Sequence, residues 1–247
     1  MTRIMVMGDV HAQIFRMYEI AKNWEFHNGK HIDGIIQVGD FGVCREWTDW
    51  KEPWEKDAPP IPTLVIMGNH EDPAAIRDWQ AEPDRIPDMW LLGDGEVVDF
   101  LGIKVGGIWG NYSPKSYANP ERVLQHRKPG GNHKIAVHIY RPSVEKLLQY
   151  DGPMDILVTH DSASICFPDE FRKPMPDGVP DILGLEHVES LQAKGCPAFD
   201  ELLKKHQPKY YFYGHLHGSS VMRVGRTHCE LLNAIQYSDT PYAVVEF

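Results

Sequence analysis

The amino-acid sequence predicts an α/β protein whose functional groups lie at one edge of a β-sheet. Short apolar segments of strand length alternate with segments that carry apolar residues at helical spacing. Several of the apolar segments end in glycine followed by a polar residue, as in "GD" and "GN". Because ligands bind beyond the carboxyl ends of the strands in open α/β sheets, we expect a site at this edge.

The first part of the chain supplies three buried strands and a helix. Strands are expected at 3–9, 33–40 and 63–70, because each segment is short and apolar and stops at a polar cluster. Residues 13–26 are expected to form a helix from the spacing of their apolar residues. Residues 89–110 change character, since glycine punctuates several short strand-like runs and no helical pattern is present.

The rest of the chain alternates again before it ends in β-structure. The expected elements are, in order, a helix at 141–150, a strand at 154–160, a helix at 188–206 interrupted at 195–197, a strand at 209–215, and a β-hairpin and edge strand from 219–234 and 242–247. Two proline-rich stretches, 44–62 and 161–184, are expected to be long loops. Long loops in compact domains tend to be functional or disordered.

Length and composition are those of an ordinary globular protein. The chain has 247 residues, of which 42% are hydrophobic and 24% charged, and we expect residues 1–247 to form a single domain. The net charge is −10 and the isoelectric point is about 5.7. This acidic balance argues against a broad basic surface for nucleic acid. An anionic substrate would need a local positive centre instead.

Nothing in the sequence indicates export or membrane insertion. The N-terminal segment shows no small-residue cleavage site, and no apolar stretch reaches the length needed to cross a bilayer. The cysteines form no C-x-x-C pair and are expected to be free thiols of a reducing compartment. They are Cys44, Cys166, Cys196 and Cys229. These observations predict a cytoplasmic protein with no membrane partner.

Five of the expected strand ends carry carboxylate, carboxamide or imidazole groups. They are Asp9 and His11 in "GDVH", Asp40 in "GDFG", Asn69 and His70 in "GNHED", His160 in "THDS", and His215 and His217 in "GHLHG". Taken singly, each group is more simply a turn, a cap or a hydrogen-bonded structural residue. Together, at the ligand-binding edge of a sheet, they predict a metal centre. Mixed oxygen and nitrogen ligands suit Mn, Fe or Zn.

The ordered series GD-x-H, GD, GNH-E, H and GH-x-H resembles the calcineurin-like metallophosphoesterase superfamily, over residues 8–218. The resemblance implies a four-layer αββα sandwich, in which two mixed β-sheets are flanked by helices and a dinuclear metal centre lies at the carboxyl ends of the strands. It also implies the ligands: Asp9, His11 and His217 for one ion, Asn69, His160 and His215 for the other, and Asp40 as the bridge between them.

The resemblance further implies a reaction and its cofactors. The cofactors are two divalent ions, with Mn²⁺ expected and Fe or Zn as alternatives. A metal-bound hydroxide would attack phosphorus in line, and two closely spaced metals would stabilise the attacking and leaving oxygens. His70 matches the family histidine that contacts the phosphate and assists the leaving group, and Glu71 or Asp72 could orient it. The expected substrate is a phosphodiester or phosphomonoester.

Some motifs of the sequence differ from those of individual groups within the superfamily. "GDFG" lacks the "GD-x-x-DR" continuation of protein Ser/Thr phosphatases. "GDF", "VGGIWGNY" and "DILVTHDS" are similar to motifs of RNA lariat debranching enzymes. However, Asp9 stands where those enzymes often carry cysteine, and this chain is shorter than theirs. The resemblance therefore does not imply that the substrate is a lariat RNA.

The sequence defines the residues that would contact the substrate less closely than it defines the metal ligands. Arg45, Asn111 and Tyr112 lie near motifs and are candidate substrate-binding residues. A surface position explains Arg45 equally, and a solvated surface is the simpler interpretation of Asn111 and Tyr112. Tryptophans in the stretch 44–62 could stack a base or pack their own loop. Nucleotide, nucleic acid and phosphoprotein substrates are not distinguished, nor is an oligomeric state indicated. A protein Ser/Thr phosphatase, a non-catalytic metal-binding scaffold, and an ester or amide hydrolase remain the alternatives.

Overall fold

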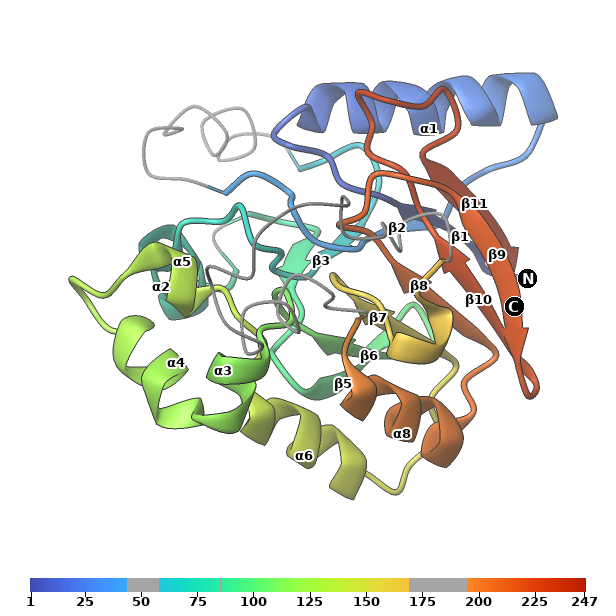
Figure 1. The fold of residues 1–247 in the computed structure, drawn as a ribbon. Helices are drawn as coiled ribbons and strands as arrows, with labels where there is room; N and C mark the ends of the chain where they lie inside the picture. Colours follow the sequence, from blue (N-terminus) through green and yellow to red (C-terminus); the bar gives the residue numbers. More distant parts are fainter. Residues whose placement is uncertain (44–57, 85, 169–194) are drawn as a thin grey trace, which may run out of the picture.

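The computed structural model describes residues 1–43, 58–84, 86–168 and 195–247. It contains two mixed β-sheets (Figure 1). The first has the strand order β11-β1-β2-β3-β4, formed by Tyr242–Glu246, Arg3–Met7, Gly34–Gln37, Thr63–Val65 and Met89–Leu91. Strands β1 to β4 run parallel, and β11 is antiparallel to β1. The two chain termini therefore lie side by side (Figure 1).

The second sheet has the strand order β5-β6-β7-β8-β10-β9. Its strands are Glu96–Phe100, Ile103–Ile108, Ile156–Thr159, Tyr210–Tyr213, Thr227–Leu231 and Ser220–Val224. The four central strands, β6, β7, β8 and β10, pair in parallel, and the two edge strands pair antiparallel to their neighbours. The parallel strands of each sheet deliver their carboxyl ends to a common edge.

Helices cover the outer faces of the two sheets (Figure 1). The helices of the described ranges are α1 (Ile14–Asn28), α2 (Pro73–Ala81), α3 (Pro114–Ala118), α4 (Pro120–His126), α5 (His133–Ala136), α6 (Arg141–Gln149) and α8 (Pro197–His206), with a short 3₁₀ helix, η2, at Ser164–Cys166. In α1 the buried residues recur every three or four positions, which gives one apolar face. None of the helices in the described ranges is long and apolar enough to cross a membrane.

Strand β7 shows why the molecule has four layers. Its side chains alternate between two apolar cores: Ile156 and Val158 pack in the core between the sheets, and Leu157 packs in a second core with α6 and α8. A strand that is buried on both faces needs a covering layer on each side. The four-layer arrangement implied by the sequence resemblance is therefore confirmed.

Most of the expected elements are present, with shorter bounds. The regular strands end before the motif glycines, or before His160 in β7, so the polar clusters lie in the loops beyond the strands. Residues 89–110 form three strands and no helix, and the C-terminal hairpin and edge strand are confirmed. Of the helix expected at 188–206, the described part begins at Pro197, the last residue of the expected interruption. The remainder of that expectation lies outside the described residues.

Helices α2 to α5 were not expected from the sequence. Helix α2 had a readable start signal, because Asp72 caps it by accepting a hydrogen bond from the Ala74 amide and Pro73 comes directly after the cap. The other three are very short, which hides any apolar periodicity. Of the four cysteines, Cys166, Cys196 and Cys229 are buried free thiols, as expected, and Cys44 lies outside the described residues.

Candidate functional site

The two sheets bring their strand ends together at one place. The first sheet contributes the loops after β1, β2 and β3, and the second contributes the loops after β7 and β8. All eight motif residues lie in this group of loops: Asp9, His11, Asp40, Asn69, His70, His160, His215 and His217. The convergence expected from the sequence is present in the structure.

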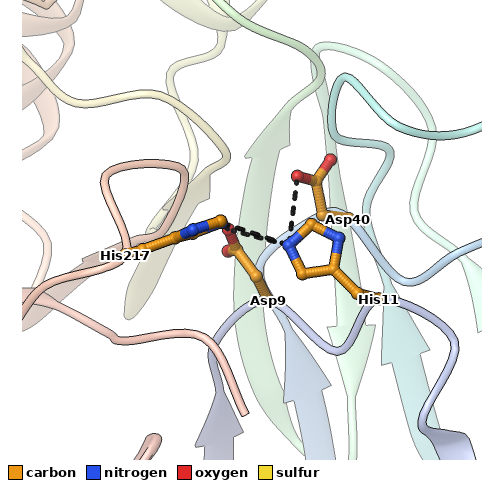
Figure 2. A group of neighbouring side chains, drawn as sticks. All are labelled: Asp9, His11, Asp40 and His217. Carbon is orange, nitrogen blue, oxygen red and sulfur yellow. Dashed lines mark hydrogen bonds and ion pairs between the residues drawn. The ribbon is translucent and has the colours of Figure 1, made fainter. Parts of the chain in front are cut away.

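Four of these side chains form a compact cluster of potential metal ligands (Figure 2). The ligand atoms of Asp9, His11, Asp40 and His217 all lie within 4.8 Å of one another. His217 Nε2 lies 3.1 Å from Asp9 Oδ2 and 3.1 Å from His11 Nε2. His11 Nε2 is 3.9 Å from Asp40 Oδ2. Two carboxylates and two imidazole nitrogens aimed at one point fit a divalent cation of the Mn, Fe or Zn type.

A second group of potential ligands adjoins the first through Asp40. His160 Nε2 lies 2.8 Å from Asn69 Oδ1 and 3.3 Å from Asp40 Oδ1, while its Nδ1 lies 3.1 Å from the carbonyl oxygen of Val38. The His215 ring contacts the His160 ring at a centroid distance of 5.1 Å. If Nδ1 donates its proton to the carbonyl, a neutral His160 turns the Nε2 lone pair toward two oxygens. Either a proton or a metal ion at Nε2 would then stabilise the close approach of this nitrogen to the two oxygens.

Electrostatics support the pairing of His160 with the carboxylates. Burial alone would lower the pKa of His160, but the neighbouring carboxylates, above all Asp40, raise this pKa to about 10. Burial would raise the pKa of Asp40, but the charge and hydrogen bond of His160 hold it well below its usual range. The neighbouring carboxylates therefore favour the protonated form of His160 in the absence of a metal ion.

The remaining imidazoles differ in how readily they lose a proton. Burial lowers the pKa of His11 and of His215, which favours their neutral, ligating form. The hydrogen bond with Asp9 raises the pKa of His217. His11 and His215 thus favour the form that can bind a metal, whereas His217 would give up its proton when a metal binds.

The backbone at the site is held in an uncommon conformation. Four of the motif residues have positive φ angles: 43° at His11, 54° at Asp40, 66° at His215 and 48° at His217. Residues other than glycine rarely adopt this left-handed region, and such strain persists only where the surroundings enforce it. At His215 the enforcing contact is Asp9, whose two carboxylate oxygens accept from the His215 amide at 3.2 and 3.1 Å.

Glycine is required at two motif positions because a side chain there would clash with a carboxylate of the site. A Cβ atom at Gly214 would lie 2.1 Å from Asp9 Oδ1, and one at Gly68 would lie 2.2 Å from Asp40 Oδ1. These carboxylate oxygens therefore occupy the volume that a side chain would need. The glycine that opens "GHLHG" thus allows the loop after β8 to approach Asp9.

The carboxylates next to His70 have structural partners. Glu71 is buried and accepts hydrogen bonds from the backbone amides of Gly42 and Gly68. Burial raises the pKa of Glu71 to about 7. Asp72 caps α2. Both carboxylates therefore bind backbone amides of the described chain, and neither orients the His70 ring, which their proximity in sequence had suggested for one of them.

Of the three residues expected to bind substrate, the structure describes Asn111 and Tyr112. Arg45 and the tryptophans of its loop lie outside the described residues. Asn111 and Tyr112 come after β6, and the Tyr112 amide donates to Asp161 Oδ2 at 2.7 Å. Since Asp161 is the residue directly after His160, this hydrogen bond ties the loop after β6 to the site.

Two residues near the site were missed in the sequence. Asp161 had a weak signal, because it stands beside a motif histidine in "THDS". Tyr237 had none: it lies in an irregular segment of the tail, and its ring packs against His217 with centroids 5.3 Å apart. Only the folded chain shows this proximity.

Comparison with known proteins shows the family to which the chain is similar. Residues 2–219 match the model of the calcineurin-like phosphoesterase family. The chain is 26% identical over 245 residues to a lariat debranching enzyme of Arabidopsis thaliana, covering 87% of this chain and 54% of that one. It is 26% identical over 232 residues to the lariat debranching enzyme of Homo sapiens, covering 87% and 42%. The chain thus spans about half the length of these curated relatives.

Solved structures show the same fold at low sequence identity. The phosphopantetheinyl hydrolase of Mycobacterium tuberculosis superimposes with a TM-score of 0.58 at 14% identity, covering 99% of this chain and 95% of that one. A protein of Thermus thermophilus gives a TM-score of 0.54 at 14% identity, covering 94% and 89%. Together with the match over residues 2–219, these findings show that the chain belongs to the calcineurin-like phosphoesterase family.

Proposed function

We propose that this chain hydrolyses phosphoric esters at a centre of two divalent metal ions. The observation that carries the proposal is the pair of adjacent ligand groups that share Asp40: its Oδ2 faces His11 at 3.9 Å, and its Oδ1 faces His160 at 3.3 Å. A carboxylate with one oxygen toward each group is suited to bridge two ions. The family match and the relatives named lariat debranching enzyme support ester hydrolysis.

The proposed ligands divide between the two groups. Asp9, His11 and His217 would hold one ion, while Asn69, His160 and His215 would hold the other. When bound, two such ions polarise the phosphoryl oxygens and activate water as a nucleophile near neutral pH. We propose Mn²⁺ as the native metal, on the preference of mixed oxygen and nitrogen ligands for Mn, Fe or Zn.

We propose that His70 handles a proton rather than binds metal. Its side chain is 61% exposed, so its ring faces solvent, and its Nε2 lies 3.9 Å from Asp40 Oδ2 at the border of the centre. The His70 amide donates to Asp40 Oδ1 at 2.9 Å, which fixes the backbone beside the bridge. We propose that His70 donates a proton to the leaving oxygen of the ester and stabilises charge on the phosphoryl group.

The test is metal-dependent hydrolysis of a matched pair of chromogenic esters. Purified protein is loaded with Mn²⁺ and assayed on bis(p-nitrophenyl) phosphate and p-nitrophenyl phosphate, with and without a chelator, and its metal content is measured. The expected result is chelator-sensitive release of p-nitrophenolate, with two ions per chain. The ratio of the two rates then distinguishes a diesterase from a monoesterase. Absence of turnover on both esters, with two ions bound, would contradict the proposal and favour a non-catalytic scaffold.

A further inference from the structure

Tyr237 is a solvent-exposed aromatic residue on the rim of the candidate centre. Its side chain is 65% exposed, and its ring centroid lies 5.3 Å from that of His217, with 40° between the ring planes. One side of the tyrosine thus faces a proposed metal ligand, and most of the ring remains in water. A large aromatic residue exposed beside a site is a candidate contact for a ligand.

Buried neighbours and backbone hydrogen bonds fix the position of Tyr237, and contacts of its own ring are not needed for this. The segment before it contains Ala234 and Ile235, which are both fully buried. The Ile235 amide donates to the carbonyl oxygen of Asp9 at 2.9 Å, and the Tyr237 amide donates to the carbonyl oxygen of Ala234 at 3.0 Å. The turn that presents the tyrosine is therefore anchored to the backbone of a proposed ligand. A platform that is already ordered loses little entropy when a ligand binds.

Successive ring contacts relate Tyr237 to His70. The rings of His70 and His11 lie 5.1 Å apart, those of His11 and His217 lie 5.1 Å apart, and those of His217 and Tyr237 lie 5.3 Å apart. His70 and Tyr237 are thus the first and last members of a row of contacting rings. If His70 serves the leaving oxygen, Tyr237 is separated from it by two rings, and the substituent that stays on phosphorus is its candidate partner.

We propose that Tyr237 stacks on the base of a nucleoside that remains attached to phosphorus, so that the substrate is a nucleoside phosphodiester. This inference rests on the proposed function, because it specifies the ester on which the same site acts. An aromatic face accepts any base, so the contact selects a nucleoside over an alkyl group without selecting among bases. It also fits the acidic chain, because stacking on one base requires no broad basic surface.

The first experiment compares two esters that share a leaving group. Thymidine 5′-(p-nitrophenyl phosphate) and methyl p-nitrophenyl phosphate both lose p-nitrophenolate when water attacks phosphorus, and they differ only in the group retained. The specificity ratio is kcat/KM for the thymidine ester divided by kcat/KM for the methyl ester. Base stacking predicts a ratio of roughly 10 or more in the unaltered protein.

Variants test whether the ring of Tyr237 produces this ratio. Tyr237→Ala should lower the ratio about tenfold, while Tyr237→Phe, which keeps the ring and loses the hydroxyl, should retain it. Phe26→Ala removes another exposed aromatic residue, 84% exposed on α1, and should leave both rates unchanged. An equal ratio in the unaltered protein and Tyr237→Ala would overturn the proposal. So would loss of the ratio in Tyr237→Phe, which would assign the effect to the hydroxyl.

A binding measurement separates this proposal from the proposed function. Calorimetric titration of the Mn²⁺-loaded protein with thymidine 5′-monophosphate and with methyl phosphate requires no turnover. The nucleotide should bind at least about tenfold more tightly, and Tyr237→Ala should remove that advantage. If neither ester is hydrolysed but this binding pattern is found, the proposed function fails while the role of Tyr237 stands. If both esters are hydrolysed and the two phosphates bind equally, only the role of Tyr237 fails.

Discussion

His160 and Asp40 meet across the junction of the two sheets, with His160 Nε2 lying 3.3 Å from Asp40 Oδ1. Asp40 lies beyond the end of β2 in the first sheet, and His160 lies at the end of β7 in the second. Both side chains are buried. The candidate centre is therefore assembled only when the two sheets pack together, because each sheet alone carries only part of it.

Replacing His70 tests whether it acts on the substrate or holds metal. The substitution His70→Ala should lower kcat by about 100- to 10,000-fold, the usual contribution of a general acid, and leave the metal content at two ions. Rates on bis(p-nitrophenyl) phosphate and elemental analysis of the dialysed protein give the two readouts. His133→Ala, at an exposed histidine of α5, is the matched control. Loss of metal from His70→Ala would instead make His70 a ligand.

Replacing Asp40 tests the bridge. The substitution Asp40→Asn keeps the shape and an acceptor oxygen for the Asn69 and His70 amides but removes the negative charge that two cations would share. We expect both ions to be lost on dialysis and hydrolysis to disappear, with the circular dichroism spectrum retained. Asp99→Asn, at an exposed carboxylate paired with Lys104, controls for the loss of one surface charge. An Asp40→Asn protein that still holds two ions would refute the bridging role.

The glycine before His215 can be tested by adding one methyl group. In Gly214→Ala the new Cβ would lie 2.1 Å from Asp9 Oδ1, so Asp9 or the loop must move. We expect a loss of roughly 1–3 kcal/mol in the free energy of unfolding and weaker metal binding.

The matched control for this substitution is Gly225→Ala. Gly225 has a φ of 60° and no atom within 4 Å of an added Cβ, so this change introduces backbone strain without a clash. It should cost about 1–2 kcal/mol and leave metal binding intact. Urea unfolding and metal titration measure the two effects, and equal metal affinities in the two variants would argue against a spatial role for Gly214.

His138 should make the stability of the fold depend on pH. Burial lowers the pKa of His138 below its ordinary value, with Arg122 contributing in the same direction, and its Nδ1 lies 2.8 Å from Ser116 Oγ. Because the folded state favours the neutral ring, the unfolded chain binds more protons below about pH 6.5. The stability contributed by the neutral ring is therefore complete above that pH and is lost as the pH falls.

The measurement is urea unfolding from pH 7.5 to 5.5 of the unaltered protein and His138→Gln, both in chelator. The unaltered protein should lose more stability on acidification, by at most about 1.4 kcal/mol per pH unit for one proton. His133→Gln controls for the removal of an imidazole. Parallel pH profiles of the unaltered protein and His138→Gln would show that His138 does not supply this dependence.

The motifs made the membership of the site predictable, because each strand of a parallel sheet brings the loop at its carboxyl end to the same edge. Asp9, Asp40, Asn69 and His160 could each be placed in this way from a short apolar run and the polar residue behind it. The sequence resemblance then implied which residues would share an ion. Helices α3 to α5 could not be predicted, since segments this short depend on packing rather than on their own periodicity.

By itself, then, the sequence determined the strands, the residue types at their ends and the donor chemistry, which are properties of local segments. Only the tertiary structure decided how these segments meet: that Asp40 faces both ligand groups, that Gly214 leaves room for Asp9, and that Tyr237 packs against His217. Such contacts join residues far apart in the chain, and no local pattern encodes the distance between them. They are set by the packing of two sheets whose central strands are buried on both faces.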